Sequence, residues 1–261
     1  MFSSLLTAST GLQAQQLSID VIANNLANVN TVGFKRSRAD FEDLLYHTYR
    51  APGTKSARGV EIPTGLQVGR GTRPVATSRE FSTGELRNTG NPLDLAIEGK
   101  GFFQVRLPSG ELAYTRAGAF KTDALGQLTT PDGNPVEPAI SIPPDAVNVT
   151  IGKDGSVTAA IAGQPDAVDL GQIQLAYFVN PAGLLSKGRN LYTETNASGP
   201  PSISSPGENG VGTLAQGFLE SSNVKIMEEM VDMIVSQRAY EINAKVVQTV
   251  DQMLHYLSSL R

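Results

Sequence analysis

The chain contains no cysteine, which excludes disulfide bonds, thiolate metal sites and cysteine nucleophiles. It also contains no tryptophan, and aromatic residues make up only 6% of it, so few rings are present that can stack on sugars. Its two histidines, His47 and His255, lie far apart in the sequence, so a histidine-based triad or metal site requires long-range convergence. The sequence therefore predicts that the protein is not an enzyme and holds no catalytic residue, metal or cofactor.

Charge is scarce as well. Charged residues make up 18% of the chain, and its formal net charge of -4 gives no cationic surface to attract nucleic-acid phosphates or anionic lipid. No apolar run approaches the ~20 residues that cross a bilayer. Residues 1–16 lack the basic and apolar regions of a cleavable signal, and Lys35 is the first basic residue. We expect no nucleic-acid partner, no membrane insertion and no cleaved signal peptide.

Short segments that resemble ligand-binding loops are incomplete. The segment Gly99-Lys100-Gly101 lacks both the earlier glycine and the following Ser or Thr of a phosphate loop. The pairs Asp132-Gly133 and Asp154-Gly155 are not followed by the regularly spaced oxygen ligands of a calcium loop. Together with Ser109-Gly110 they are typical of hairpin turns, which need a residue at positive φ.

Glycine and proline are concentrated in the interior of the chain, and the last 40 residues contain neither. Between these turn-forming residues, short alternating segments rich in β-branched and aromatic residues have the length of strands. These segments are Leu93–Glu98, Phe102–Leu107, Glu111–Thr115, Gln172–Val179 and Asn190–Glu194. They predict a central, mostly antiparallel β domain over residues 73–217, built as a sandwich or irregular barrel. Residues 34–72, punctuated by Pro and Gly, are predicted to form an extended connecting arm.

Both ends of the chain carry apolar residues at seven-residue intervals, the repeat of a coiled-coil helix. In the first segment one register contains Leu5, Leu12, Ile19 and Leu26, and the other contains Ala8, Ile22 and Val29. In the last segment one register contains Ala239, Val246, Met253 and Leu260, and the other contains Val235, Ile242 and Tyr256. The pattern predicts helices over residues 1–33 and 218–261 that form an antiparallel coiled coil, apolar seam against apolar seam. The overall fold class is therefore α+β.

The two helices admit two interpretations, a layer covering the core of the β domain or an interface between copies. The seams are narrower than the stripe of a core-facing helix. Gly11 and Asn24-Asn25 weaken the first helix, and a two-helix hairpin buries too little to be stable alone. These features favour self-assembly. The predicted interface residues are Leu5, Leu12, Ile19, Ile22, Leu26, Val29, Val235, Ile242, Val246, Met253 and Leu260.

Two terminal motifs resemble the signatures of bacterial flagellar rod and hook proteins. The first is Asn24-Asn25-Leu26-Ala27-Asn28 with Gly33-Phe34-Lys35, and the second is Gln237-Arg238-Ala239-Tyr240-Glu241. Interior segments such as Asp94–Ile97 and Gly101–Val105 extend the resemblance over essentially the whole chain. Within the family the chain is most similar to subunits of the distal rod, whose extra stretch its residues 46–69 resemble.

The resemblance implies a structural subunit that polymerises helically into the rod of the flagellar basal body, which crosses the periplasm and transmits motor torque to the hook. Implied partners are other copies of the chain, proximal rod subunits, hook or hook-junction subunits, the surrounding basal-body ring and the flagellar export apparatus. A proximal rod or hook subunit is the alternative within the family. A periplasmic domain that binds or hydrolyses cell wall is the alternative from another class, and it needs a cleft lined by paired acids, histidines or aromatic rings.

Overall fold

The computed structural model describes residues 2–53, 63–162 and 166–259, and the chain divides into two compact units. The first unit combines the two ends of the chain with residues 37–78. The second unit contains residues 27–36 and 79–224. None of the described helices is long and apolar enough to cross a membrane.

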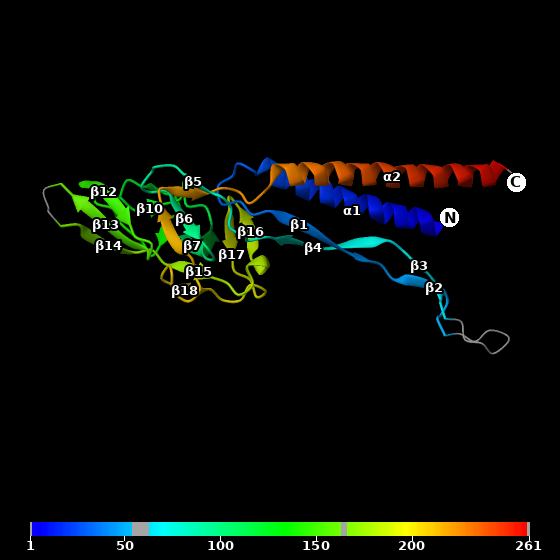
Figure 1. Ribbon diagram of the computed structural model, residues 1–261, viewed down its shortest axis with the longest axis horizontal. Helices are drawn as coiled ribbons and strands as arrows, with labels where there is room; N and C mark the ends of the chain where they lie inside the picture. The colour runs from blue at the N-terminus through cyan, green and yellow to red at the C-terminus, as the bar shows by residue number, and fades with distance from the viewer. Residues whose placement is uncertain (1, 54–62, 163–165, 260–261) are drawn as a thin grey trace. The chain divides into compact units, whose positions relative to one another are not determined.

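Two long helices belong to the first unit. Helix α1 (Phe2–Ala27) has 26 residues, and helix α2 (Ile226–Ser259) has 34 residues and no Gly or Pro to interrupt it. Glu228 and Glu229 lie in the first turn of α2, where their negative charge interacts favourably with the positive end of the helix dipole. Figure 1 shows the helices side by side with the two chain termini at the same end, so the helices are antiparallel.

Two pairs of strands complete this unit. Strand β1 (Ser37–Asp43) pairs with β4 (Thr72–Arg79), and β2 (Tyr46–Arg50) pairs antiparallel with β3 (Leu66–Gly69). All five side chains of β2 are exposed. The predicted extended arm thus forms paired strands in its described part (Figure 1); its residues 54–62 lie outside the described residues.

The second unit consists almost entirely of short strands, and all of its strand pairs with a recorded register are antiparallel. Its strands are β5 (Leu86–Asn88), β6 (Leu95–Glu98), β7 (Phe102–Arg106), β8 (Leu112–Thr115), β9 (Lys121–Thr122), β10 (Leu128–Thr129), β11 (Val136–Glu137), β12 (Ala146–Ile151), β13 (Ser156–Ile161), β14 (Val168–Gln172), β15 (Leu175–Tyr177), β16 (Leu185–Gly188), β17 (Leu191–Thr193), β18 (Ser202–Ser204), β19 (Thr213–Gln216) and β20 (Phe218–Glu220). A 3-10 turn, η1 (Pro181–Gly183), precedes β16.

These strands form one seven-stranded sheet and several smaller ones. The large sheet has the order β16-β17-β8-β7-β15-β18, and β11 also pairs with β7. Strands β12, β13 and β14 form a three-stranded sheet. The predicted hairpin glycines Gly110, Gly133 and Gly155 all have positive φ, at 84°, 83° and 86°. The prediction of a terminal helix at each end of a mostly antiparallel β domain is therefore confirmed.

One predicted strand is misplaced. The alternating segment Gln172–Val179 is not a single strand, because β14 ends at Gln172 and β15 occupies only Leu175–Tyr177. The side chain of Gln172 donates to the Asp154 carbonyl, 2.8 Å away, and Ile173 N donates to Gly155 O over the same distance. The chain therefore changes strand partners at this point, and residue alternation alone carries no information about where a partner changes.

The core of this unit lies between the sheets. Leu95, Ile97, Phe103 and Val105 are completely buried in its largest apolar cluster, and burying a side chain of this size contributes about 1.5–3 kcal/mol. A second cluster is aromatic, and Tyr114 and Phe178 meet edge to face with ring centroids 4.8 Å apart. The β unit therefore has its own packed interior, as an independently folding domain requires.

Candidate functional site

Three contacts between α1 and α2 involve small and polar residues. Asn25 Nδ2 donates to Glu229 Oε2 at 3.0 Å, and the hydroxyl oxygens of Ser18 and Ser236 are 3.3 Å apart. A Cβ added to Gly11 would lie 3.0 Å from Nδ2 of Asn243, so the helices approach closely there. Along each helix these residues recur every seven positions. We call this set the inner seam: Gly11, Ser18, Asn25, Glu229, Ser236 and Asn243.

The predicted apolar seams remain partly or largely accessible in the single chain. On α2, Val235, Ile242 and Met253 have 61%, 64% and 53% of their surface exposed. On α1, Ile22 is buried, while Leu5, Leu12, Ile19 and Leu26 are only partly buried. The coiled-coil pairing of apolar seam against apolar seam is therefore not confirmed. Each helix carries a second, polar set of residues with the same seven-residue repeat, and that set makes hydrogen bonds and a close approach between the helices.

The exposed apolar residues of α2 include eight large side chains outside the inner seam. An α-helix turns about 100° per residue, so Val231 and Ile234 lie roughly opposite Glu229, whereas Val246, three positions after Asn243, lies beside the inner seam. We call the eight residues the outer stripe: Met227, Val231, Ile234, Val235, Ile242, Val246, Met253 and Tyr256, all of them exposed. So many exposed large apolar side chains on one helix indicate an interaction site. Among the other predicted interface residues, Val29 is partly buried in the β unit, and Leu260 lies outside the described residues.

The two terminal motifs divide into buried and exposed parts. In the first motif Asn25, Gly33, Phe34 and Lys35 are buried, and the remaining residues, Asn24, Leu26, Ala27 and Asn28, are partly or fully exposed. In the second motif Ala239 is partly buried, while Gln237, Arg238, Tyr240 and Glu241 are exposed, and Arg238 and Glu241 form a surface ion pair of 2.8 Å. Half of the first motif is therefore buried within the single chain, whereas most of the second motif lies on its surface.

Lys35, the last residue of the first motif, lies in a fully buried ion pair within the β unit. Its Nζ donates to Glu220 Oε1 and to the Ser82 carbonyl, each at 2.6 Å. Gly84 N donates to the same carboxylate oxygen at 2.9 Å. Burial lowers the pKa of Lys35, and the charge of Glu220 opposes that shift. The pair thus ties the chain just after α1 to the chain just before α2.

Arg116 is the third member of this buried cluster. Its Nη2 donates to the Gly99 carbonyl at 2.6 Å, and its Nε lies 3.7 Å from Glu220 Oε2. Burial lowers the pKa of Arg116, while Glu220 raises it. Two cations therefore share one buried carboxylate, and the cluster depends on Glu220 for its charge balance.

The backbone of the first motif explains its glycine. Gly33 has a φ of +70°, and a Cβ at this position would come within 2.6 Å of Ala117 N. Only glycine permits both this conformation and this close approach. Sequence reasoning found Gly33 and Lys35 through the motif but missed Glu220 and Arg116. In the sequence Arg116 is a single charged residue directly after the alternating strand β8. Its burial cannot be inferred from that position.

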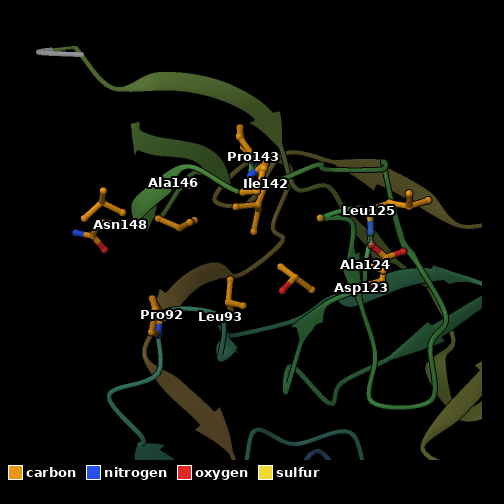
Figure 2. Close-up of a pocket in the computed structure, with 14 residues that line it drawn as sticks. Pro92, Leu93, Asp123, Ala124, Leu125, Ile142, Pro143, Ala146 and Asn148 are labelled. Carbon is orange, nitrogen blue, oxygen red and sulfur yellow. Dashed lines mark hydrogen bonds between the residues drawn. The ribbon is translucent and has the colours of Figure 1, made fainter. Parts of the chain in front are cut away.

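A cavity of about 540 Å³ lies elsewhere in the β unit (Figure 2). Prolines and aliphatic side chains such as Leu93 and Ile142 dominate its lining. Its only ionisable residue is Asp123, whose Oδ1 accepts the N–H groups of Leu125 and Gln127, both at 2.8 Å. The Asp123 carboxylate therefore stabilises the turn that contains it. The cavity lining offers no pair of groups for acid and base catalysis.

The described residues contain no cluster of three or more His, Asp or Glu side chains with metal-binding geometry. His47 is exposed in β2 and meets Tyr49 edge to face with centroids 4.5 Å apart, and His255 is exposed on α2. Neither histidine lines the cavity of Figure 2. The most developed candidate site of the molecule is thus a surface, the outer stripe.

Three family models match the chain. Residues 5–35 match a model described as flagella basal body rod protein, and residues 96–159 match the flagellar hook protein FlgE/F/G D1 domain. Residues 215–260 match the flagellar basal body rod FlgEFG protein C-terminal model. The matches cover both helices and part of the β unit.

Several full-length relatives share one name. The flagellar basal-body rod protein FlgG of Buchnera aphidicola subsp. Schizaphis graminum is 54% identical over 260 residues, which is 100% of both chains. The protein of that name from Caulobacter vibrioides is 50% identical over 259 residues, 99% of each chain. That of Bacillus subtilis is 41% identical over 266 residues and 100% of both chains.

Proposed function

The chain belongs to the flagellar basal-body rod protein family as a structural subunit of the distal rod, and on that premise we propose that its copies polymerise helically through the outer stripe of α2. The observation that carries the proposal is the exposure of this stripe. A soluble monomer rarely exposes so many large apolar residues on one helix. In a polymer the same residues leave water, which contributes roughly 1.5–3 kcal/mol for each one fully buried.

The partly buried apolar residues of α1 supply the complementary surface in this proposal. Leu5, Leu12, Ile19 and Leu26 recur every seven residues and are each partly accessible. Seven-residue repeats on two helices are the pattern that knobs-into-holes packing requires. The outer stripe of one copy and the apolar residues of α1 in another would then form the coiled-coil contact that the single chain lacks.

The strand pair β2 and β3 supports a second contact between copies. Tyr46, Tyr49, Leu66 and Val68 are exposed large side chains on this two-stranded element. A two-stranded hairpin is marginally stable by itself and gains stability from packing on a neighbour. We propose that this element clamps adjacent subunits and stiffens the rod, which then transmits torque to the hook. The rod joins proximal rod and hook subunits, lies inside the basal-body ring, and receives its subunits from the flagellar export apparatus without signal cleavage.

Imaging of the purified chain tests polymerisation directly. We expect concentration-dependent, hollow helical tubes in negative-stain electron micrographs, because burial of the outer stripe becomes favourable once copies meet. A variant lacking residues 46–69 should form more flexible tubes if this segment stiffens the rod. Monomeric particles at all concentrations would contradict the proposal, and equally stiff tubes from the deletion variant would remove the argument for the clamp.

A further inference from the structure

The inner seam is polar where an antiparallel helix pair ordinarily packs apolar residues. It contains the hydrogen bond of Asn25 to Glu229 and the contact of Ser18 with Ser236, with Gly11 against Asn243 one repeat further on. In all three pairs the two residue numbers add to the same value, so every contact belongs to one helix register. The three pairs therefore all belong to a single alignment of α1 against α2.

We propose that these polar contacts fix the register of α1 against α2. The inference goes beyond the proposed function, because it concerns the contact between two helices of one chain and not the contact between copies. Buried polar groups in helical pairs select one alignment at some cost in stability, because any other alignment leaves them without partners. An apolar seam tolerates alternative alignments far better.

A slip by one repeat shows how the selection works. If Ser18 moved opposite Asn243, Gly11 would face Val250 and Asn25 would face Ser236. Glu229, which is completely buried, would lose the Asn25 amide. Leaving a buried charged acceptor without such a donor is unfavourable. The polar groups therefore penalise the slip although small residues leave room for it.

Asn25 also connects the seam to the strand that follows α1. Its Nδ2 donates to the Ser37 carbonyl at 2.8 Å, and its Oδ1 accepts from Ser37 N at 2.9 Å. One side chain thus joins α1, α2 and β1. A slip of α2 along α1 would leave the two bonds to Ser37 in place and break the bond to Glu229, so Asn25 holds a fixed orientation against which the alignment of α2 is set.

The absence of cysteine permits a clean test by engineered disulfides in the full-length chain. The pair Ser18→Cys with Ser236→Cys reports the proposed register, since the serine oxygens are 3.3 Å apart and a disulfide requires close Cβ atoms. The pair Ser18→Cys with Asn243→Cys reports the slipped register. Under mild oxidation of dilute monomer we expect the first pair to cross-link in most molecules and the second at least about tenfold less.

A second comparison separates register selection from simple packing. In a chain that also carries Asn25→Leu and Glu229→Leu, we expect cross-linking of the slipped pair to rise at least about fivefold, because the penalty on other alignments has gone. Circular dichroism confirms that both helices remain formed. The proposal is overturned if the slipped pair stays as rare as before, or if the two cysteine pairs cross-link equally in the parent chain.

An assembly assay on the cross-linked chain distinguishes this inference from the proposed function. The cross-linked Ser18→Cys, Ser236→Cys chain should still form tubes, since its register is the native one and its outer stripe is free. Selective cross-linking without tubes would support the register and contradict polymerisation. Tubes without selective cross-linking would support polymerisation and contradict the proposed register.

Discussion

Replacing Ile242 by aspartate is expected to abolish assembly while leaving the monomer folded. Ile242 is 64% exposed on α2, so the substitution should change the free energy of unfolding by only about 0.5 kcal/mol. In the proposed polymer the same position would be buried among neighbouring copies, where an unpaired carboxylate costs about 3 kcal/mol or more. The concentration needed for assembly should therefore rise at least roughly 100-fold.

Sedimentation and electron microscopy measure this effect, and circular dichroism measures helix content in the monomer. The matched control is Gln248→Asp, which introduces the same charge at an exposed position of α2 outside the outer stripe. Gln248→Asp should assemble nearly as the parent chain does. If Ile242→Asp still builds tubes at the parent's concentration, the outer stripe is not the interface.

Replacing Glu220 by glutamine is expected to destabilise the β unit strongly. The change keeps the size of the side chain but leaves Lys35 and Arg116 as buried cations without a counter-charge. Removing one partner of a buried ion pair costs about 3–5 kcal/mol. Thermal unfolding should shift downward by roughly 2–4 °C for each kcal/mol lost in a unit of this size. The surface control Glu137→Gln, which breaks an exposed pair with Arg106, should lose at most about 1 kcal/mol.

The loss of stability in Glu220→Gln should depend on pH. Burial already lowers the pKa of Lys35, and removing the Glu220 charge that opposes this shift lowers it further. Between the lowered folded pKa and the ordinary lysine value, the unfolded chain binds more protons than the folded chain, so stability rises with pH. Denaturant unfolding at pH 7 and pH 9.5 should therefore show a smaller deficit at the higher pH. An equal deficit at both values would mean that Lys35 is not the group left uncompensated.

The terminal helices and their seven-residue period could be predicted from sequence, but the hydrogen-bonded contacts between them could not. Leu5 to Leu26 and Val235 to Met253 carry a clear seven-residue repeat, and both segments are helical. The repeat of Gly11, Ser18 and Asn25 has the same period and was not recognised. Apolar residues ordinarily face inward, and that expectation assumes that the partner surface belongs to the same chain. In a subunit whose apolar residues are buried only by another copy, the apolar face of the helix points outward in the single chain.

The buried cluster shows a different limit of sequence reasoning. Lys35 stood in a recognised motif, yet nothing in the sequence connected it to Glu220, which lies 185 positions away. Charged residues are usually exposed, so the sequence favours a surface location for all three members. Their burial follows from tertiary contacts among β20, the end of β8 and the chain after α1. Short hairpins such as the one at Gly110 were predictable because their geometry is local.

The most direct test of the account is the accessibility of the outer stripe before and after assembly. A single cysteine introduced as Val235→Cys in this cysteine-free chain can be labelled with a water-soluble maleimide. In dilute monomer we expect labelling as fast as that of a free thiol, since Val235 is 61% exposed. In assembled tubes we expect labelling to slow at least about tenfold, because the position becomes buried between copies. Slow labelling in the monomer, or equal rates in both states, would contradict the claim that this surface is covered only by another copy.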